Sequence, residues 1–189
     1  PLSPCPMTDQ ELAIRCMKGD PSAQQALWKS YSGKMYSVCR RYFDREEDAQ
    51  DALQESFIKV FGHLEQWRQQ GPLGAWIRRI VVNTSLNLVK SRANQANWMA
   101  IEGKQDLKHP DADAVARLGE EDLIKLIQAM PTGYRTVFNL FAIEGYSHKE
   151  IADALGVTEN TSKTQYLKAK NWLKNKLEHN TTHHLEKHG

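Results

Sequence analysis

The chain has 189 residues, of which 40% are apolar and 25% charged, and this composition excludes disordered, collagen-like and disulfide-dense chains. The length allows one mid-sized domain or two small ones, and the net charge of +2 is informative only through its distribution. No apolar run exceeds four residues, which excludes a membrane helix, and the first residues lack a secretory signal, so we expect a cytoplasmic protein.

The first half of the chain predicts four helices. Thr8 and Glu11 form a capping box that opens a short helix, and Gly19 closes it. Asp20 is followed by proline, which is the pattern of an N-cap and a first helical residue. Apolar residues then recur at intervals of three or four as far as Tyr42, so a long amphipathic helix is expected after Asp20.

The third and fourth helices each have one apolar and one polar face. We expect Asp44 to cap the third helix, whose apolar stripe consists of Ala49, Ala52, Leu53, Phe57, Val60 and Leu64. Gly71 and Pro72 then break the chain. The fourth helix is expected over 73–92, with an inward face of Leu73, Trp76, Ile77, Ile80, Thr84 and Leu88.

The second half begins with a segment that lacks periodicity. Residues 93–118 carry an acidic bias, which predicts a linker. Apolar periodicity then returns, stops at Pro131 and resumes as far as Gly145. Ser147 opens another capping box and a short helix, and Thr158 caps a last helix that ends at about Glu178. The predicted fold is all-α, with small helical domains at 8–92 and 119–178, a flexible linker at 93–118 and a tail at 179–189.

The charges are segregated along the chain. Residues 44–65 contain seven acids and two bases, whereas residues 66–101 contain five cations and no acid. Residues 163–176 again contain five lysines and no acid. Cationic tracts without neighbouring acids are typical of sites that bind a polyanion, whereas a solvated face usually mixes both signs.

The segment from Lys149 to Thr158, followed by a basic helix, predicts a helix-turn-helix. A small residue such as Ala152 lets two helices approach, and Gly156 turns the chain where a side chain would clash. The second helix of such a pair fits a major groove. A structural helix pair of the same pattern is the alternative.

The helix at 73–92 is a second candidate site. Its outward positions are Arg78, Arg79, Asn83, Asn87 and Lys90. These side chains can track phosphates or bind unstacked bases, and the loop at 66–72 could hold a base turned out of the duplex. An ordinary basic face of a helical bundle is the competing interpretation.

Three segments in this order resemble the extracytoplasmic-function group of bacterial RNA polymerase sigma factors, over residues 8–178. The segment 48–61, DAQDALQESFIKVF, is similar to the helix of this family that binds polymerase. The segment 74–87, GAWIRRIVVNTSLN, is similar to its minus-10 helix. The segments 130–140 and 145–170 are similar to its minus-35 domain, which contains the helix-turn-helix.

The resemblance implies an initiation subunit that directs core RNA polymerase to promoters and is not an enzyme. It implies sigma region 2 at 8–92 and sigma region 4 at 119–178. Contact with the clamp coiled coil of the largest polymerase subunit is expected from Asp48, Asp51, Gln54, Glu55 and Phe57. Contact with the minus-10 element is expected from Trp76, Arg78, Arg79, Asn83, Asn87 and Lys90. Contact with the minus-35 element is expected from Thr161, Lys163, Thr164, Gln165, Lys168 and Lys170. An anti-sigma factor is a further candidate partner, and no cofactor is expected.

Promoter geometry predicts dependence on polymerase. Promoter elements about 25 base pairs apart are separated by roughly 85 Å. The ends of a free linker as long as 93–118 lie on average roughly 25–30 Å apart, and they are roughly 90 Å apart when the linker is fully extended. We therefore expect polymerase to hold the two domains apart and the free protein to bind promoter duplex poorly. One departure is Ser162, which stands where helix-turn-helix sequences usually have a branched apolar residue.

Two other functions remain as alternatives. A response-regulator type of transcription factor has a similar helix-turn-helix over 145–177 but needs a receiver or ligand domain with strands, and residues 8–92 predict helices only. A metal site could form at His179, His183, His184 and His188. The three cysteines, Cys5, Cys16 and Cys39, lack C-x-x-C spacing, which favours buried thiols.

Overall fold

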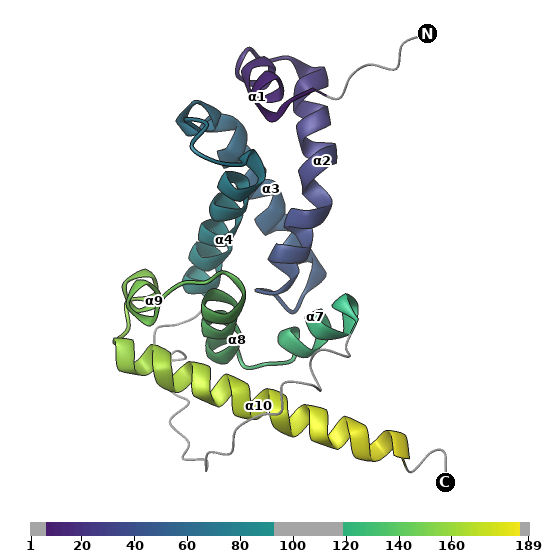
Figure 1. Ribbon diagram of the computed structural model, residues 1–189, viewed down its shortest axis with the longest axis vertical. Helices are drawn as coiled ribbons and strands as arrows, with labels where there is room; N and C mark the ends of the chain where they lie inside the picture. The colour runs from purple at the N-terminus through teal and green to yellow at the C-terminus, as the bar shows by residue number, and fades with distance from the viewer. Residues whose placement is uncertain (1–6, 93–118, 186–189) are drawn as a thin grey trace. The chain divides into compact units, whose positions relative to one another are not determined.

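The computed structural model describes residues 7–92 and 119–185, with the backbone alone at residue 120 and over 178–185. The predicted linker at 93–118 lies outside the described residues. Within them every regular element is a helix, and the chain divides into two compact units, Pro1–Leu88 and Val89–Gly189 (Figure 1). The predicted all-α class with two helical domains is confirmed, and no strand of a receiver domain occurs over residues 7–92. None of the described helices combines the length and apolarity needed to cross a membrane.

The first unit begins with α1 (Asp9–Met17) and α2 (Pro21–Arg40), and their predicted starts are confirmed. The Thr8 backbone donates to the Glu11 carboxylate at 3.1 Å, and the Glu11 backbone donates to the Thr8 hydroxyl at 3.2 Å. Gly19 adopts a φ of +76°, a conformation that glycine reaches without strain. Local capping chemistry therefore sets both ends of α1.

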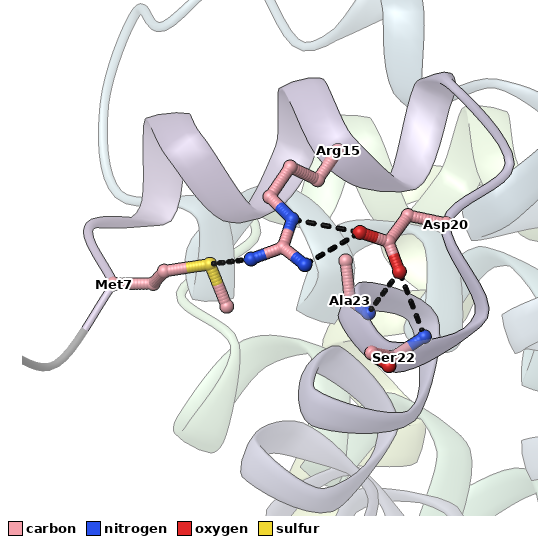
Figure 2. Close-up of polar contacts among 5 residues, drawn as sticks. All are labelled: Met7, Arg15, Asp20, Ser22 and Ala23. Carbon is pink, nitrogen blue, oxygen red and sulfur yellow. Dashed lines mark hydrogen bonds and ion pairs between the residues drawn. The ribbon is translucent and has the colours of Figure 1, made fainter. Parts of the chain in front are cut away.

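Asp20 joins the end of α1 to the start of α2 (Figure 2). One carboxylate oxygen accepts from the backbone amides of Ser22 at 2.9 Å and Ala23 at 3.3 Å, which caps α2. The other oxygen accepts from Arg15 Nε at 2.7 Å, and Arg15 Nη1 reaches Met7 Sδ at 3.2 Å. The hydrogen bond from Arg15, followed by those from the two amides, lowers the pKa of Asp20.

The core of the first unit lies among α2, α3 (Glu46–Gly62) and α4 (Leu73–Arg92), with a short 3₁₀ turn, η1 (Leu64–Gln66), between the last two. The predicted apolar stripe of α3 is confirmed, because all six residues are buried. On α4 the buried row is only partly as predicted. Leu73, Ile77 and Thr84 are buried, whereas Trp76, Ile80 and Leu88 are half-buried and Val81, Ser85 and Val89 are buried in their place.

The predicted cap of α3 is wrong. The helix begins one residue later than expected, with Arg45 at the N-cap and no capping hydrogen bond from its side chain. Tyr42 and Phe43 are both buried, so the connection from α2 is fixed by ring packing before Asp44 is reached. Glu46, with two further acids after it, then provides the negative charge that favours a helix N-terminus.

The second unit comprises α7 (Glu120–Gln128), α8 (Thr132–Phe138), α9 (His148–Leu155) and α10 (Glu159–Leu185). A π-helical segment, η2 (Asn139–Ile143), continues α8. The predicted helix to Gly145 is therefore α-helical as far as Phe138 and π-helical from Asn139 to Ile143. Ile127, Met130, Ala169 and Leu173 form a buried cluster between the first and last of these helices. In Figure 1, α8 and α9 lie along the first half of α10, which continues to Leu185 rather than ending near residue 178.

A buried arginine connects α7 and α8. Arg135 is 3% exposed, and its Nη1 donates to the Gln128 backbone carbonyl at 2.7 Å. This carbonyl belongs to the last turn of α7, the part of a helix where side chains commonly bind backbone carbonyls. Arg135 therefore ends α7 in the way that a C-cap does.

Candidate nucleic-acid interface

The outer face of α3 is acidic with an apolar centre. Asp51 and Gln54 are exposed, and Glu55 is half-buried and pairs with Lys59 at 2.6 Å. Ile58 is 72% exposed, the most exposed large apolar side chain among the described residues. Because positions i, i+3, i+4 and i+7 share one face of a helix, Ile58 lies beside the polar residues that sequence analysis singled out. It was missed because Phe57 accounted for the apolar position.

Phe57 does not belong to this face. It is only 2% exposed, and its ring meets Trp28 of α2 edge-on at a centroid distance of 4.6 Å. A side chain in this position cannot contact a partner without opening the core between α2 and α3. The predicted contact of Phe57 with polymerase stays a prediction, and the burial of this side chain counts against it. Asp48, which is half-buried, lies at the margin of the face.

A polar row runs along the outside of α4. Arg79, Asn83, Asn87 and Lys90 are all exposed, and their spacing of three or four residues places them on one face. Trp76 is half-buried at the N-terminal end of this row. Arg78 is also half-buried, and its place next to Arg79 in the helix turns it about 100° away from the row. The structure thus brings together five of the six predicted residues and sets Arg78 apart.

The loop before α4 is tightly folded. The Trp67 indole nitrogen donates to the Gly71 carbonyl at 3.2 Å, which closes the loop across four residues. Gln69 has a φ of +57°, the only positive value among described residues other than glycine. Arg68, Gln69 and Gln70 are exposed on this loop. A left-handed non-glycine residue is uncommon and stores some strain, as functional loops often do.

The predicted helix-turn-helix is present as α9 and α10. Ser147 and Glu150 form the predicted capping box, and Gly156 ends α9 with φ +70° and ψ 34°. Ala152 is buried at the helix contact. The Thr158 hydroxyl accepts from the backbone amide of residue 161 at 3.0 Å, which is the predicted cap of α10.

The first turns of α10 present a mixed polar surface. Lys163 and Thr164 are exposed, and Thr161, Lys168 and Lys170 are half-buried. The predicted DNA contact of Gln165 stays a prediction, and burial counts against it, because this residue is 8% exposed and its Oε1 lies 3.2 Å from the position that a Cβ on Gly133 would occupy. It packs against α8 and is not presented at the surface.

Ion pairing and ring contact position two of these lysines. Lys163 Nζ lies 2.7 Å from a Glu159 carboxylate oxygen, and this contact lowers the pKa of Glu159. Lys170 Nζ lies 5.0 Å from the centroid of the Tyr166 ring. The negative face of an aromatic ring attracts a cation, and this attraction holds the end of the Lys170 side chain beside Tyr166.

The unusual Ser162 is buried and has a polar partner. Its side chain is 0% exposed, and its hydroxyl lies 2.9 Å from His148 Nδ1. The His148 ring stacks on Phe141 at a centroid distance of 4.2 Å. Burial first and the charge of Lys163 second lower the pKa of His148, against a smaller opposing effect of Glu159.

Metal ligands do not converge among the described side chains, where no group of three or more His, Cys, Asp or Glu residues could hold an ion. The four histidines of the predicted alternative metal site, at 179, 183, 184 and 188, lie outside the described side chains. Cys16 and Cys39 are buried free thiols, as expected. Burial raises the pKa of Cys39 to about 11.

Two family models match the chain, Sigma-70 region 2 over residues 27–95 and Sigma-70, region 4 over residues 120–173. The chain is 26% identical over 183 residues to the ECF RNA polymerase sigma-E factor of Haemophilus influenzae, which covers 91% of this chain and 96% of the relative. It is also 26% identical to the sigma-E factor of Escherichia coli K12, covering 91% and 95%. The sigma factor RpoE of Bartonella quintana, solved with the anti-sigma factor NepR, is 17% identical and shares the fold with a TM-score of 0.50, covering 82% of this chain and 96% of that chain.

Proposed function

Because the chain belongs to the extracytoplasmic-function group of the sigma-70 family, we propose that it is the initiation subunit that directs core RNA polymerase to specific promoters. The observation that carries this proposal is the order of the two family regions, which coincide with two helical units that each expose a polar, cation-bearing helix. The family consists of initiation subunits and not of enzymes. We place its action in the cytoplasm, where polymerase transcribes.

The outer face of α3 is the proposed docking face for the clamp coiled coil of the largest polymerase subunit. Asp51, Gln54 and Glu55 provide polar contacts for a basic partner, and Ile58 provides an apolar contact that they surround. Such charge complementarity sets orientation and association rate more than affinity. The affinity must therefore come largely from apolar burial.

The proposed promoter contacts are divided between the two domains, 8–92 and 119–178. Arg79, Asn83, Asn87, Lys90 and Trp76 of α4 would engage the minus-10 element, with the loop at 66–72 holding a flipped base and Arg78 at the margin. Thr161, Lys163, Thr164, Lys168 and Lys170 of α10 would engage the minus-35 element. Amides can hydrogen-bond base edges, and lysines favour phosphates.

An anti-sigma factor is a proposed further partner. The solved relative from Bartonella quintana binds one, and an exposed apolar centre such as Ile58 on an acidic face is a surface that a regulatory protein could cover. Competition between such a partner and polymerase for α3 would make initiation switchable.

The test combines a pull-down of core polymerase with run-off transcription. The full chain should bind core enzyme and support specific initiation. Asp51→Lys should weaken core binding without changing the fold, because its side chain is exposed on the docking face. Glu65→Lys is the matched control, with the same charge change at an exposed acid outside α3. Tight, selective binding of duplex without polymerase would contradict the proposal.

A further inference from the structure

We propose that His148 is the positioning residue of the helix-turn-helix, which holds α10 against α9 through Ser162 and makes this hold sensitive to acid. The proposal rests on the function proposed above, because α10 matters only if it reads DNA. It also explains why a serine occupies a position where a branched apolar residue is usual.

The first step of the argument is the burial of Ser162. It lies in the first turn of α10 and is 0% exposed. A buried hydroxyl without a hydrogen-bond partner lowers the stability of the fold. The residue that forms this hydrogen bond therefore also fixes the orientation of α10. The partner is His148 Nδ1, at 2.9 Å.

The second step is that the imidazole ring is itself held in place. His148 is the first residue of α9, and its ring lies nearly parallel to that of Phe141, with an interplanar angle of 13°. Tyr166 of α10 flanks the ring at a centroid distance of 5.9 Å. The ring therefore links the π-helical segment η2, the start of α9 and the start of α10, and can transmit a fixed orientation to the recognition helix.

The third step concerns the proton. In the neutral ring Nδ1 can accept the hydrogen bond that the Ser162 hydroxyl donates, whereas a protonated ring offers only donors. The charged groups that face the ring are Lys163 and Glu159 of α10, with Lys149 of α9 close to Glu159, and η2 contributes only uncharged Phe141. The start of α9 and Lys163 both disfavour a positive ring.

Acidification should therefore weaken the hold. Protonation reverses the hydrogen bond to Ser162 and places a second positive charge beside Lys163. Burial and this lysine lower the pKa of His148, so the folded domain takes up its proton at a lower pH than the unfolded chain. The domain consequently loses stability as the pH falls below about 6.5, the ordinary value for histidine.

The first experiment follows the His148 ring by NMR in the full chain during a pH titration, with His148→Gln for assignment. In Ser162→Ala the midpoint of the His148 titration should move to a higher pH, because the neutral ring loses the hydrogen bond that the Ser162 hydroxyl donates. Thr136→Val is the control, since Thr136 is also a buried hydroxyl but donates to the Thr132 carbonyl of its own helix at 2.8 Å. An unchanged midpoint in Ser162→Ala, or an equal shift in the control, would overturn the proposal.

The second experiment measures how much an intact minus-35 element strengthens holoenzyme binding to promoter DNA. Ser162→Ala should reduce this gain about fivefold to tenfold at pH 7.5, which corresponds to one lost buried hydrogen bond. His148→Leu/Ser162→Val replaces the polar pair with an apolar one. In this variant the minus-35 element should again strengthen holoenzyme binding as much as in the wild type. This strengthening should not decrease between pH 7.5 and 6.0, as it does in the wild type. An equal decrease in that variant would overturn the proposal.

The two experiments also separate the proposal from the function on which it rests. If wild-type holoenzyme gains nothing from a minus-35 element, the proposed function fails. The NMR titration uses the chain without polymerase or DNA, so it still decides whether His148 is held through Ser162.

Discussion

Truncation of Ile58 tests the docking face most directly. Ile58→Ala removes three carbons, and each is worth about 0.8 kcal/mol when buried. Scaled by the 72% of the side chain that is free to be buried, the loss is about 1.7 kcal/mol, or about a 17-fold weaker complex with core polymerase. The isolated chain should keep its stability, because an exposed substitution usually changes it by about 0.5 kcal/mol or less.

The assay is a titration of fluorescently labelled full chain with core polymerase, read as anisotropy. Ile14→Ala is the matched control, since Ile14 is the same residue type, is 37% exposed and lies on α1, away from the docking face. Its affinity should change less than about twofold. The reasoning is refuted if Ile58→Ala binds as tightly as the wild type, or if both variants lose the same affinity.

Three further predictions concern the scaffold. Arg135→Met should destabilise the second unit by about 1–3 kcal/mol, because the Gln128 carbonyl loses the hydrogen bond from a buried charged donor, as measured by hydrogen exchange of α7 amides. Gly156→Ala should cost about 1–2 kcal/mol in urea unfolding, because its φ is +70°. The stabilisation from Asp20, whose pKa is lowered, is present above its unfolded value of about 3.9 and is lost as the pH falls through the folded value. Asp20→Asn should therefore flatten the acid dependence of thermal unfolding.

Each of these has a discriminating outcome. Unchanged exchange in α7 would show that Arg135 does not cap that helix. Gly62→Ala is the control for Gly156→Ala, since neither site has a neighbour within 4 Å of the added Cβ and only Gly156 has a positive φ. Gly62→Ala should be neutral or stabilising, and equal losses at both sites would argue against backbone strain. An equally steep acid profile in Asp20→Asn would exclude the Arg15–Asp20 pair as its cause.

The helix order could be predicted because its signals are local. Each capping box, at Thr8 and at Ser147, joins two residues that are three positions apart. The positive φ at Gly19 is a property of that residue alone. The error at Asp44 has a non-local origin, because the packing of Tyr42 and Phe43 fixes where α3 can begin. A capping pattern indicates which residues favour the N-cap position, and tertiary packing determines which of the adjacent residues occupies it.

The site was predicted less completely because helical faces are broad. Periodicity placed Phe57 and Gln165 next to the proposed surfaces, but it could not say which of the adjacent side chains the core would bury. Gly133 leaves room for the Gln165 amide, and this depends on a helix far away in the sequence. The exposure of Ile58 could have been predicted from the sequence, because it is an apolar residue that lies outside the predicted buried stripe of α3 and directly follows Phe57.

The paired charges at the proposed interfaces bear on the need for polymerase. Glu55 and Lys59 pair at 2.6 Å, and Glu159 and Lys163 pair at 2.7 Å, each four residues apart on one helix. Glu159 and Lys163 are both exposed, and an exposed pair is worth about 0–1 kcal/mol, so exchanging it for contacts with a partner changes the free energy little. If Lys163 contacts a phosphate as proposed, Glu159 stays nearby and repels the same phosphate. On the proposed function, an isolated domain would therefore gain little from DNA, and tight binding would need the proposed apolar contact at Ile58 together with the placement of both domains by polymerase.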